Sequence, residues 1–397
     1  MSFDRHSLIK LDLRVGARHN RAAMQRVIHT ESVRAALAAK GWDQKQLAQE
    51  VGVSAQAVTN WMKGVDFPRP ATLLKLAAAL AIRFDQIVLL PQADQPVIAF
   101  RKKEGTKTTD AHLLRARTMG AMLKPLVGYL PPLKALRTQI PSPSLDYERM
   151  QSAVASVRVK LCIGPEAVLS YERLIAEFDA NDAIIVPVMW GKKDRHENAL
   201  HILLPAEKIT FIYLNLDTHL EDFKFWMAHE LAHVYTPDLA GSNQGEDFAD
   251  AFAGALLFPR ELALKAYAEA SRKPAPKGEV AVLQHHANAH SISLFSVYCE
   301  VRKYASAVGL QPLKVAEKDI HTVRNSTRGD LMTAALFEPS PPDASTFIAA
   351  TNKVFKSSFF AALRRMLREQ GTGAGFVQQV LDIGIADARA ICEELHR

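Results

Sequence analysis

Residues 225–235 constrain the chain most, because they read FWMAHELAHVY and contain the pattern H-E-x-x-H. In an α-helix with 3.6 residues per turn, His229 and His233 lie one turn apart on the same face. Two imidazoles placed in this way can occupy two corners of a tetrahedral zinc site. Glu230, beside the first imidazole, is placed to act as a general base toward a water on the metal, whose pKa zinc lowers toward about 7.

A second acidic segment follows at residues 246–257 and is expected to form a helix that ends before Pro259. Glu246 stands at its polar start and is the expected third metal ligand. Asp250 follows one turn later and is expected to accept the free ring N–H of a ligand histidine, which fixes its tautomer. Two imidazoles and a carboxylate favour Zn²⁺, with manganese or iron as alternatives. The competing interpretation is an amphipathic helix with two incidental surface histidines.

Three strand candidates precede the motif, at residues 183–190, 199–204 and 209–214, with a turn at 191–196 between the first two. We expect a small antiparallel sheet beside the motif helix. An extended peptide could add to an exposed edge of such a sheet, so that its carbonyl group meets the metal.

The segment 31–91 is expected to be helical throughout, with helices at 32–39, 43–50, 55–63 and 71–81. Asp43 and Gln46 form a predicted capping box at the second helix. Gly52 allows a tight turn between the second and third helices. Two short helices joined in this way form a helix-turn-helix, whose second helix enters the major groove of DNA.

Residues 31–91 resemble the XRE/Cro-type helix-turn-helix family, which implies binding of double-stranded operator DNA. On this resemblance Gln56 can bond adenine through two atoms and Lys63 can neutralise a phosphate. A small helical bundle that binds protein is the alternative. The positions that the resemblance assigns to the groove are Ala55, Gln56 and Thr59, and those that it assigns to phosphate contact or bracing are Gln44, Asn60 and Lys63.

A second resemblance covers residues 146–310. The order is helix, Gly164-Pro165, helix, strands ending at Asn215, the H-E-x-x-H helix, and an acidic helix ending in Phe258-Pro259. This order resembles the ImmA/IrrE family of zinc peptidase domains. The resemblance implies that His229, His233 and Glu246 are the ligands and that Glu230 is the base. Characterised members of this family cut XRE-type repressors and so switch on their genes.

Composition adds few constraints. Hydrophobic residues make up 48% of the chain and charged residues 23%, which is ordinary for a globular protein. With no apolar run for a membrane span, no apolar signal core and three scattered cysteines, a cytoplasmic protein without membrane contact is expected. The net charge of +7 is compatible with nucleic-acid binding.

The expected fold class is α+β and mainly helical: an all-α helix-turn-helix domain, a zincin-like peptidase domain and a C-terminal helical region. The expected boundaries are a basic arm at 1–30, the DNA-binding domain at 31–91, a basic and proline-bearing linker at 92–145, the peptidase domain at 146–330 and the helical region at 331–397. Tyr235 and the histidines at 285, 286 and 290 are candidates for stabilising an oxyanion.

These features predict a DNA-binding transcriptional regulator fused to a zinc metalloendopeptidase. Its predicted substrate is a repressor, an antitoxin-like partner or the chain itself. The alternative is a non-catalytic transcription factor or antitoxin whose zincin-like domain senses a signal or holds a partner such as a toxin. A homodimer is expected, because XRE-like readers commonly bind palindromes as dimers.

Overall fold

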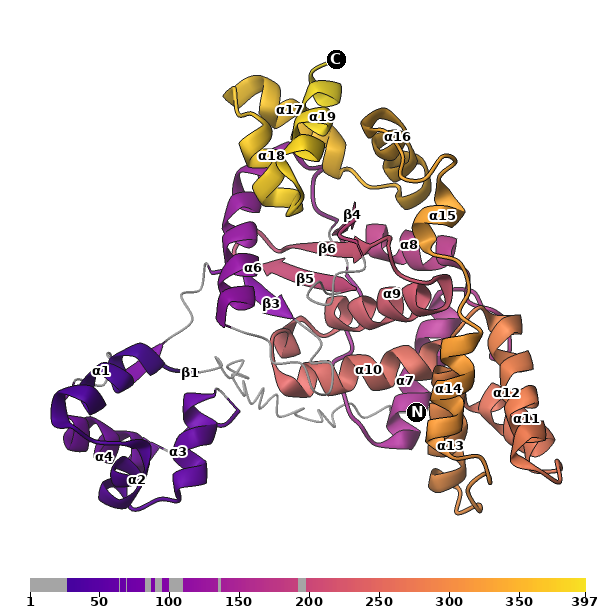
Figure 1. Cartoon of the computed structure of the whole chain (residues 1–397), viewed down its shortest axis with the longest axis horizontal. Coiled ribbons are helices and arrows are strands. Elements are labelled where there is room, and N and C mark those ends of the chain that lie inside the picture. The colour runs from indigo at the N-terminus through magenta and orange to yellow at the C-terminus, as the bar shows by residue number, and fades with distance from the viewer. Residues whose placement is uncertain are drawn as a thin grey trace, which may run out of the picture. The chain divides into compact units, whose positions relative to one another are not determined.

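The computed structural model describes residues 27–63, 65–68, 70–82, 87–89, 95–99, 110–134, 137–191 and 198–397. The chain divides into two compact units, Met1–Gln92 (the first unit) and Ala93–Arg397 (the second unit). The cationic residues of the arm predicted at 1–30 lie outside the described residues, and so does the basic run at 101–107. The predicted class is confirmed, because the described residues are mainly helical and carry a two-stranded sheet in the first unit and a four-stranded sheet in the second (Figure 1).

The described residues of the first unit include the helices α1 (Thr30–Lys40), α2 (Gln44–Val51), α3 (Ala55–Met62) and α4 (Pro70–Leu80). The capping box at α2 is confirmed: the Asp43 side chain accepts from the Gln46 backbone N–H, and the Gln46 side chain accepts from that of Asp43. Gly52 ends α2 with a φ of 76°, in the left-handed region that favours glycine. A short antiparallel pair, β1 (Val27–Ile28) with β2 (Val88–Leu89), was not predicted. The apolar core of this unit includes Leu47, Val58, Trp61, Leu73 and Leu76.

The sheet of the second unit has the order β3 (Val97–Ala99), β5 (Ala199–Leu204), β6 (Ile209–Asn215), β4 (Ala183–Val188). The prediction of an antiparallel sheet is wrong in one pairing, because β4 runs parallel to β6. β6 lies between β4 and β5, which are consecutive in the chain. The physical reason is that all seven residues of β6 are buried, so this strand needs a neighbour on both edges and cover on both faces.

The segment 92–145, predicted to be a linker, contributes structure to the second unit. It supplies the edge strand β3, the helix α6 (Asp110–Leu123) and the 3₁₀-helix η1 (Lys124–Tyr129). Leu123 and Leu126 are fully buried in the same core as the sheet. The basic side chains and prolines of this segment predict a linker, but its apolar residues pack into the same core as the sheet.

Helix α9 (Leu220–Tyr235) lies between the sheet and α10 (Asn243–Leu257) (Figure 1). Two further helices, α7 (Tyr147–Lys160) and α8 (Tyr171–Ala180), pack against α10 and α9 respectively. A further helix pair, α12 (Pro276–His290) and α13 (Leu294–Ala307), packs against α11 (Arg260–Ala270). Next in the chain come α14 (Glu317–Ser326) and α15 (Met332–Leu336).

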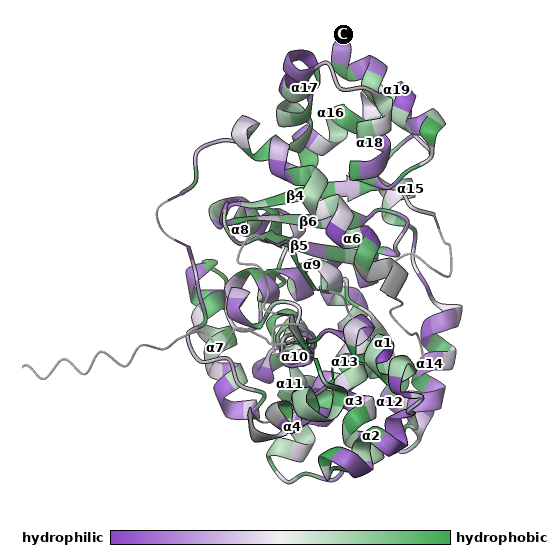
Figure 2. Ribbon diagram, turned by 90° about the vertical axis from the view of Figure 1, so that its left-hand side faces the viewer, coloured by the Kyte–Doolittle hydropathy of each residue, from purple (hydrophilic) through white to green (hydrophobic). Residues whose placement is uncertain are grey.

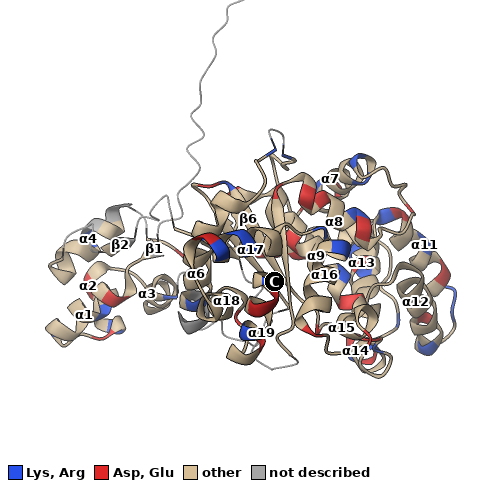
Figure 3. Cartoon of the chain, turned by 90° about the horizontal axis from the view of Figure 1, so that it is seen from above, with Lys and Arg blue, Asp and Glu red and all other residues tan. Residues whose placement is uncertain are grey.

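The C-terminal helices α16 (Ala344–Phe355), α17 (Phe359–Gln370), α18 (Ala374–Leu381) and α19 (Ile385–His396) join the same apolar core as the sheet. Trp190 Nε1 donates to the carbonyl of Leu381 at 3.0 Å, and Tyr213 Oη donates to that of Val380 at 2.8 Å. The strands are mainly hydrophobic in Figure 2, and charges of both signs alternate over the helices in Figure 3. Among the described residues, no helix has the length and apolar character that crossing a membrane requires.

Gly254 sets how closely α10 approaches α13, and it gives a test of this packing. A Cβ at this position would meet Oε1 of the buried Glu300 at 2.1 Å, so Gly254→Ala is expected to destabilise the protein by about 1–3 kcal/mol. In α18 a Cβ at Gly375 meets nothing within 4 Å, so Gly375→Ala is the matched control. Its effect is expected to stay within about 1 kcal/mol. Denaturant unfolding of both variants measures the difference, and equal midpoints would contradict the packing described.

Candidate metal centre and nucleic-acid interface

Helix α9 carries the three motif residues into the interior of the second unit. It ends at Tyr235, two residues before Pro237, as the sequence predicts. His229, Glu230 and His233 are at most 3% exposed. The Nε2 atoms of the two imidazoles face each other at 3.2 Å. The helical spacing therefore brings both nitrogen donors to one buried point.

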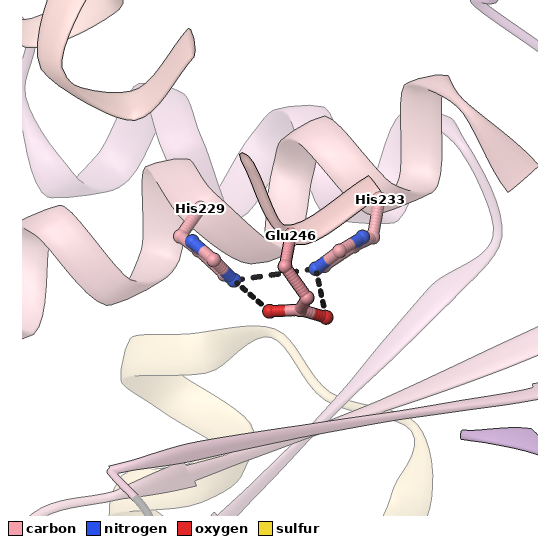
Figure 4. A group of neighbouring side chains, drawn as sticks. All are labelled: His229, His233 and Glu246. Atoms are coloured by element: carbon pink, nitrogen blue, oxygen red, sulfur yellow. Dashed lines mark hydrogen bonds and ion pairs between the residues drawn. The ribbon is translucent and has the colours of Figure 1, made fainter. Parts of the chain in front are cut away.

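Helix α10 brings a carboxylate to the same point. Glu246 lies in its first turn, with Oε2 3.4 Å from His229 Nε2 and Oε1 3.4 Å from His233 Nε2 (Figure 4). One ligand atom from each of the three residues lies within 4.8 Å of the other two. The first turn of α10 can lie against the carbonyl oxygen of Leu239 only because residue 245 is glycine. A Cβ at this position would stand 2.2 Å from that oxygen. The three residues expected to be ligands thus lie together.

Asp250 lies beside His229, as the sequence analysis expects. Its Oδ1 is 2.9 Å from Nδ1 of His229, on the side of the ring away from Glu246. A proton on Nδ1 would be shared with this carboxylate, which leaves the lone pair of Nε2 directed at the other two donors.

Two opposing effects set the pKa values in this cluster. Burial disfavours the charged form of each side chain, and contact with an oppositely charged partner favours it. Burial lowers the pKa of His229, but the carboxylates of Asp250 and Glu246 outweigh it and raise that pKa to about 9. Burial raises the pKa of Glu246, but the two imidazoles outweigh it and lower that pKa to about 2. Burial lowers the pKa of His233. The ionised carboxylate therefore requires a positive charge beside it, either a proton or a cation.

The donors fit a divalent metal ion. Both carboxylate oxygens of Glu246 are buried and lack a hydrogen-bond partner, which is costly unless a cation or water completes them. Two imidazole nitrogens and one carboxylate are the donor set of many catalytic zinc sites, where a fourth position stays open. The His229, His233 and Glu246 set is the candidate metal centre.

Glu230 points at a residue that the sequence analysis missed, His201 of β5. Oε2 of Glu230 lies 3.5 Å from Nδ1 of His201, and both atoms are buried without a hydrogen-bond partner. Burial raises the pKa of Glu230 to about 7 and lowers that of His201 to about 3. The His201 ring also meets the ring of His233 edge-on, with centroids 5.3 Å apart. The available signal was one histidine in an otherwise apolar strand.

The residues considered for an oxyanion role have other neighbours. The ring of Tyr235 packs against Phe252, and burial raises its pKa. His286 Nε2 lies 3.0 Å from a carboxylate oxygen of Glu269, and the His290 carbonyl accepts from the buried Lys224 at 2.8 Å. The His290 ring packs edge-on against Phe258, and the His285 ring packs edge-on against that of His286. These side chains therefore make their contacts outside the set of His229, His233 and Glu246.

In the first unit, the residues expected at DNA lie along α3 and at the start of α2. Gln56 is exposed, and its Nε2 donates to Oδ1 of Asn60 at 2.8 Å. Thr59 Oγ1 donates to Gln44 Oε1 at 3.3 Å and to the Ala55 carbonyl at 3.0 Å. Gln44 therefore braces α3 against α2. Lys63, just after α3, is exposed.

Comparison with known protein families gives two matches. A family described as helix-turn-helix matches residues 33–87, and the family described as IrrE N-terminal-like domain, a peptidase family, matches residues 183–282. The second match runs from β4 through the candidate metal centre into α12. No curated protein and no solved structure matches the chain. The chain therefore joins an XRE-type helix-turn-helix domain, which makes it a DNA-binding regulator, to an ImmA/IrrE-like domain of a peptidase family.

Proposed function

We propose that the second unit is a zinc-dependent endopeptidase that cuts a regulatory protein, such as a repressor or an antitoxin-like partner. The observation that carries the proposal is the convergence of His229, His233 and Glu246 from two helices, with Glu230 beside them. In this proposal His229 and His233 hold zinc through Nε2 and Glu246 holds it through its carboxylate. Zinc, when bound, polarises the scissile carbonyl and makes water more acidic.

Glu230 performs the proton transfers in the proposed hydrolysis. Its Oε2 takes a proton from the attacking water and returns it to the nitrogen of the leaving amine. Burial raises the pKa of Glu230 to about 7 in the metal-free chain. A bound cation would lower this pKa and so favour the carboxylate form that accepts the proton. His201, kept neutral by burial, lies against the same oxygen and restricts how the carboxylate can turn. Asp250 orients His229 through Nδ1.

The first unit directs the proposed peptidase to an operator, and a homodimer would match a palindromic site. Gln56 is the proposed base reader and Lys63 the proposed phosphate contact. The Gln44 side chain acts through Thr59 by fixing α3 on α2. Gln44 is therefore proposed to position α3 as well as to contact the DNA backbone.

Glu230→Gln tests the proposed chemistry. The amide cannot accept the proton, so cleavage of a candidate repressor or antitoxin-like substrate is expected to fall by about 10²–10⁴-fold. Zinc content should be unchanged, since this side chain is not one of the three donors. Glu393→Gln, an exposed glutamate on α19, is the control. Mass spectrometry of the products and metal analysis are the measurements, and full cleavage by the Glu230 variant would refute the assignment.

Asp250→Asn tests the support of the metal site. Losing the charged acceptor of the His229 ring proton is expected to weaken zinc binding by about 10–100-fold, and His229→Ala should remove it. Asp247→Asn, an exposed position in the same helix, is the matched control and should bind zinc like the parent chain. Zinc competition with a chelator measures all three. Equal affinities for the variants at 250 and 247 would contradict the orienting role.

Two substitutions in α3 and just after it separate base reading from phosphate contact. Gln56→Ala is expected to cost about 1–3 kcal/mol at one base position and to relax specificity there. Lys63→Ala should weaken binding to all sequences and reduce the salt slope by about 1. Lys75→Ala, an exposed cation on α4, serves as the control. Gel shifts on promoter DNA at several salt concentrations make the comparison, and the lack of any salt-dependent shift would favour a protein-docking role.

A further inference from the structure

The edge of the sheet beside the metal centre is covered by the chain itself. β3 pairs antiparallel with β5 in the register Val97–Leu203, Ile98–Ile202 and Ala99–His201. Residues directly opposite each other in adjacent strands share a face of the sheet. Ala99 therefore lies on the same face as His201, the residue that contacts Glu230. The distance between neighbouring strands is about 4.8 Å, so β3 runs next to the residues of the proposed reaction.

β3 is an addition to the part of the fold that the peptidase family describes. The family match begins at residue 183 and includes β4, β5 and β6, whereas β3 lies more than eighty residues earlier in the chain. In the order β3-β5-β6-β4, removal of β3 would make β5 the edge strand. An exposed edge accepts an extended peptide as one more strand, with main-chain hydrogen bonds for affinity and side-chain pockets for specificity.

On its edge away from β5, β3 contacts the segment that precedes α10, the helix that carries Glu246. Gly241 precedes α10, and a Cβ at this glycine would lie 2.9 Å from the carbonyl oxygen of Ile98 and 3.3 Å from Cγ1 of Val97. Ile98 is 8% exposed and Ala99 is 2% exposed. β3 is thus enclosed between β5 and the segment before Glu246, where a strand of substrate would have to lie to reach the cluster.

We propose that the β5 edge is the binding surface for an extended peptide of the substrate and that β3 is its internal occupant. β3 must leave before a substrate strand can pair with β5. The same geometry indicates a preference for a small side chain at the position opposite His201, where Ala99 now lies. This inference rests on the proposed function, because it concerns access to the same cluster.

A reversible lock tests the proposal. The pair Val97→Cys and Leu203→Cys places two thiols at directly opposed positions, within the range of a disulfide. Cys162→Ser removes an exposed thiol from the background. Calorimetry on the zinc-loaded full chain measures the affinity of two probes. Acetohydroxamate binds the metal alone, whereas a tripeptide hydroxamate binds the metal and also pairs with the edge of β5. Oxidation is expected to weaken the tripeptide probe by at least about tenfold, and reduction should restore it.

A second variant releases the strand. Ile98→Asp places a carboxylate in the apolar core and should unseat β3, which is expected to tighten the tripeptide hydroxamate by about tenfold. Val97→Thr, similar in shape, is the control. Acetohydroxamate should bind all forms alike. Hydrogen exchange adds a readout without chemistry: the amides of Val97 and Ala99, whose pairing parity directs them at β5, should lose protection with the tripeptide probe and keep it with acetohydroxamate.

The outcomes separate this inference from the proposed function. If acetohydroxamate binds but the tripeptide probe has one affinity for locked, reduced and released forms, the inference is wrong and the metal centre stands. If the chain takes up no zinc or acetohydroxamate binds no form, the proposed function fails and the inference fails with it. If the tripeptide probe binds without loss of protection in β3, the substrate uses another surface and the inference is overturned.

Discussion

The contact between α9 and α10 is the constraint on which the candidate site depends. A helix alone can place His229 and His233 on one face, but it cannot supply the carboxylate that neutral imidazoles need to hold a divalent cation tightly. That donor comes from Glu246 on the neighbouring helix, and the absence of a side chain at Gly245 lets the first turn of α10 lie against the Leu239 carbonyl. Loss of the packing between α9 and α10 would therefore separate the Glu246 carboxylate from the two imidazoles.

Buried charges elsewhere in the second unit show what is unusual about this cluster. Arg158 is buried, but it donates to the carbonyls of Leu256 and Gly164 at 2.7 Å each, and the buried Glu300 accepts from Lys303 at 2.7 Å. Those groups have the partners that an interior charge requires. Glu230 and Glu246 instead keep carboxylate oxygens without hydrogen-bond partners. Glu246 has only the two imidazole nitrogens, 3.4 Å away, beside its carboxylate oxygens, and a cation between these donors would complete all three groups.

Features set by neighbouring residues, such as helix caps and helix ends, were predicted from the sequence. The pairing of strands that are far apart in the sequence was not. The capping box of Asp43 and Gln46 and the end of α9 before Pro237 follow from neighbouring residues, and both were predicted. The central position of β6 shows in its burial and not in its sequence, because all seven of its residues are buried although Thr210 and Asn215 are polar. The turn expected at 191–196 pointed instead to β4 and β5 as neighbours. His201 was missed because a single histidine in a strand has no spacing to recognise. β3 was missed because three residues beside a basic run carry little pattern.

In the sequence, β3 lies between the DNA-binding unit and the rest of the proposed peptidase. β2 ends at Leu89 and closes the first unit with β1, and β3 begins at Val97 and pairs with β5 in the second unit, so seven residues of sequence separate the two strands. In the proposal above, β3 leaves β5 when a substrate strand pairs there. By linkage, if DNA binding changed how firmly β3 is held on β5, peptide binding would change the affinity for DNA by the same factor.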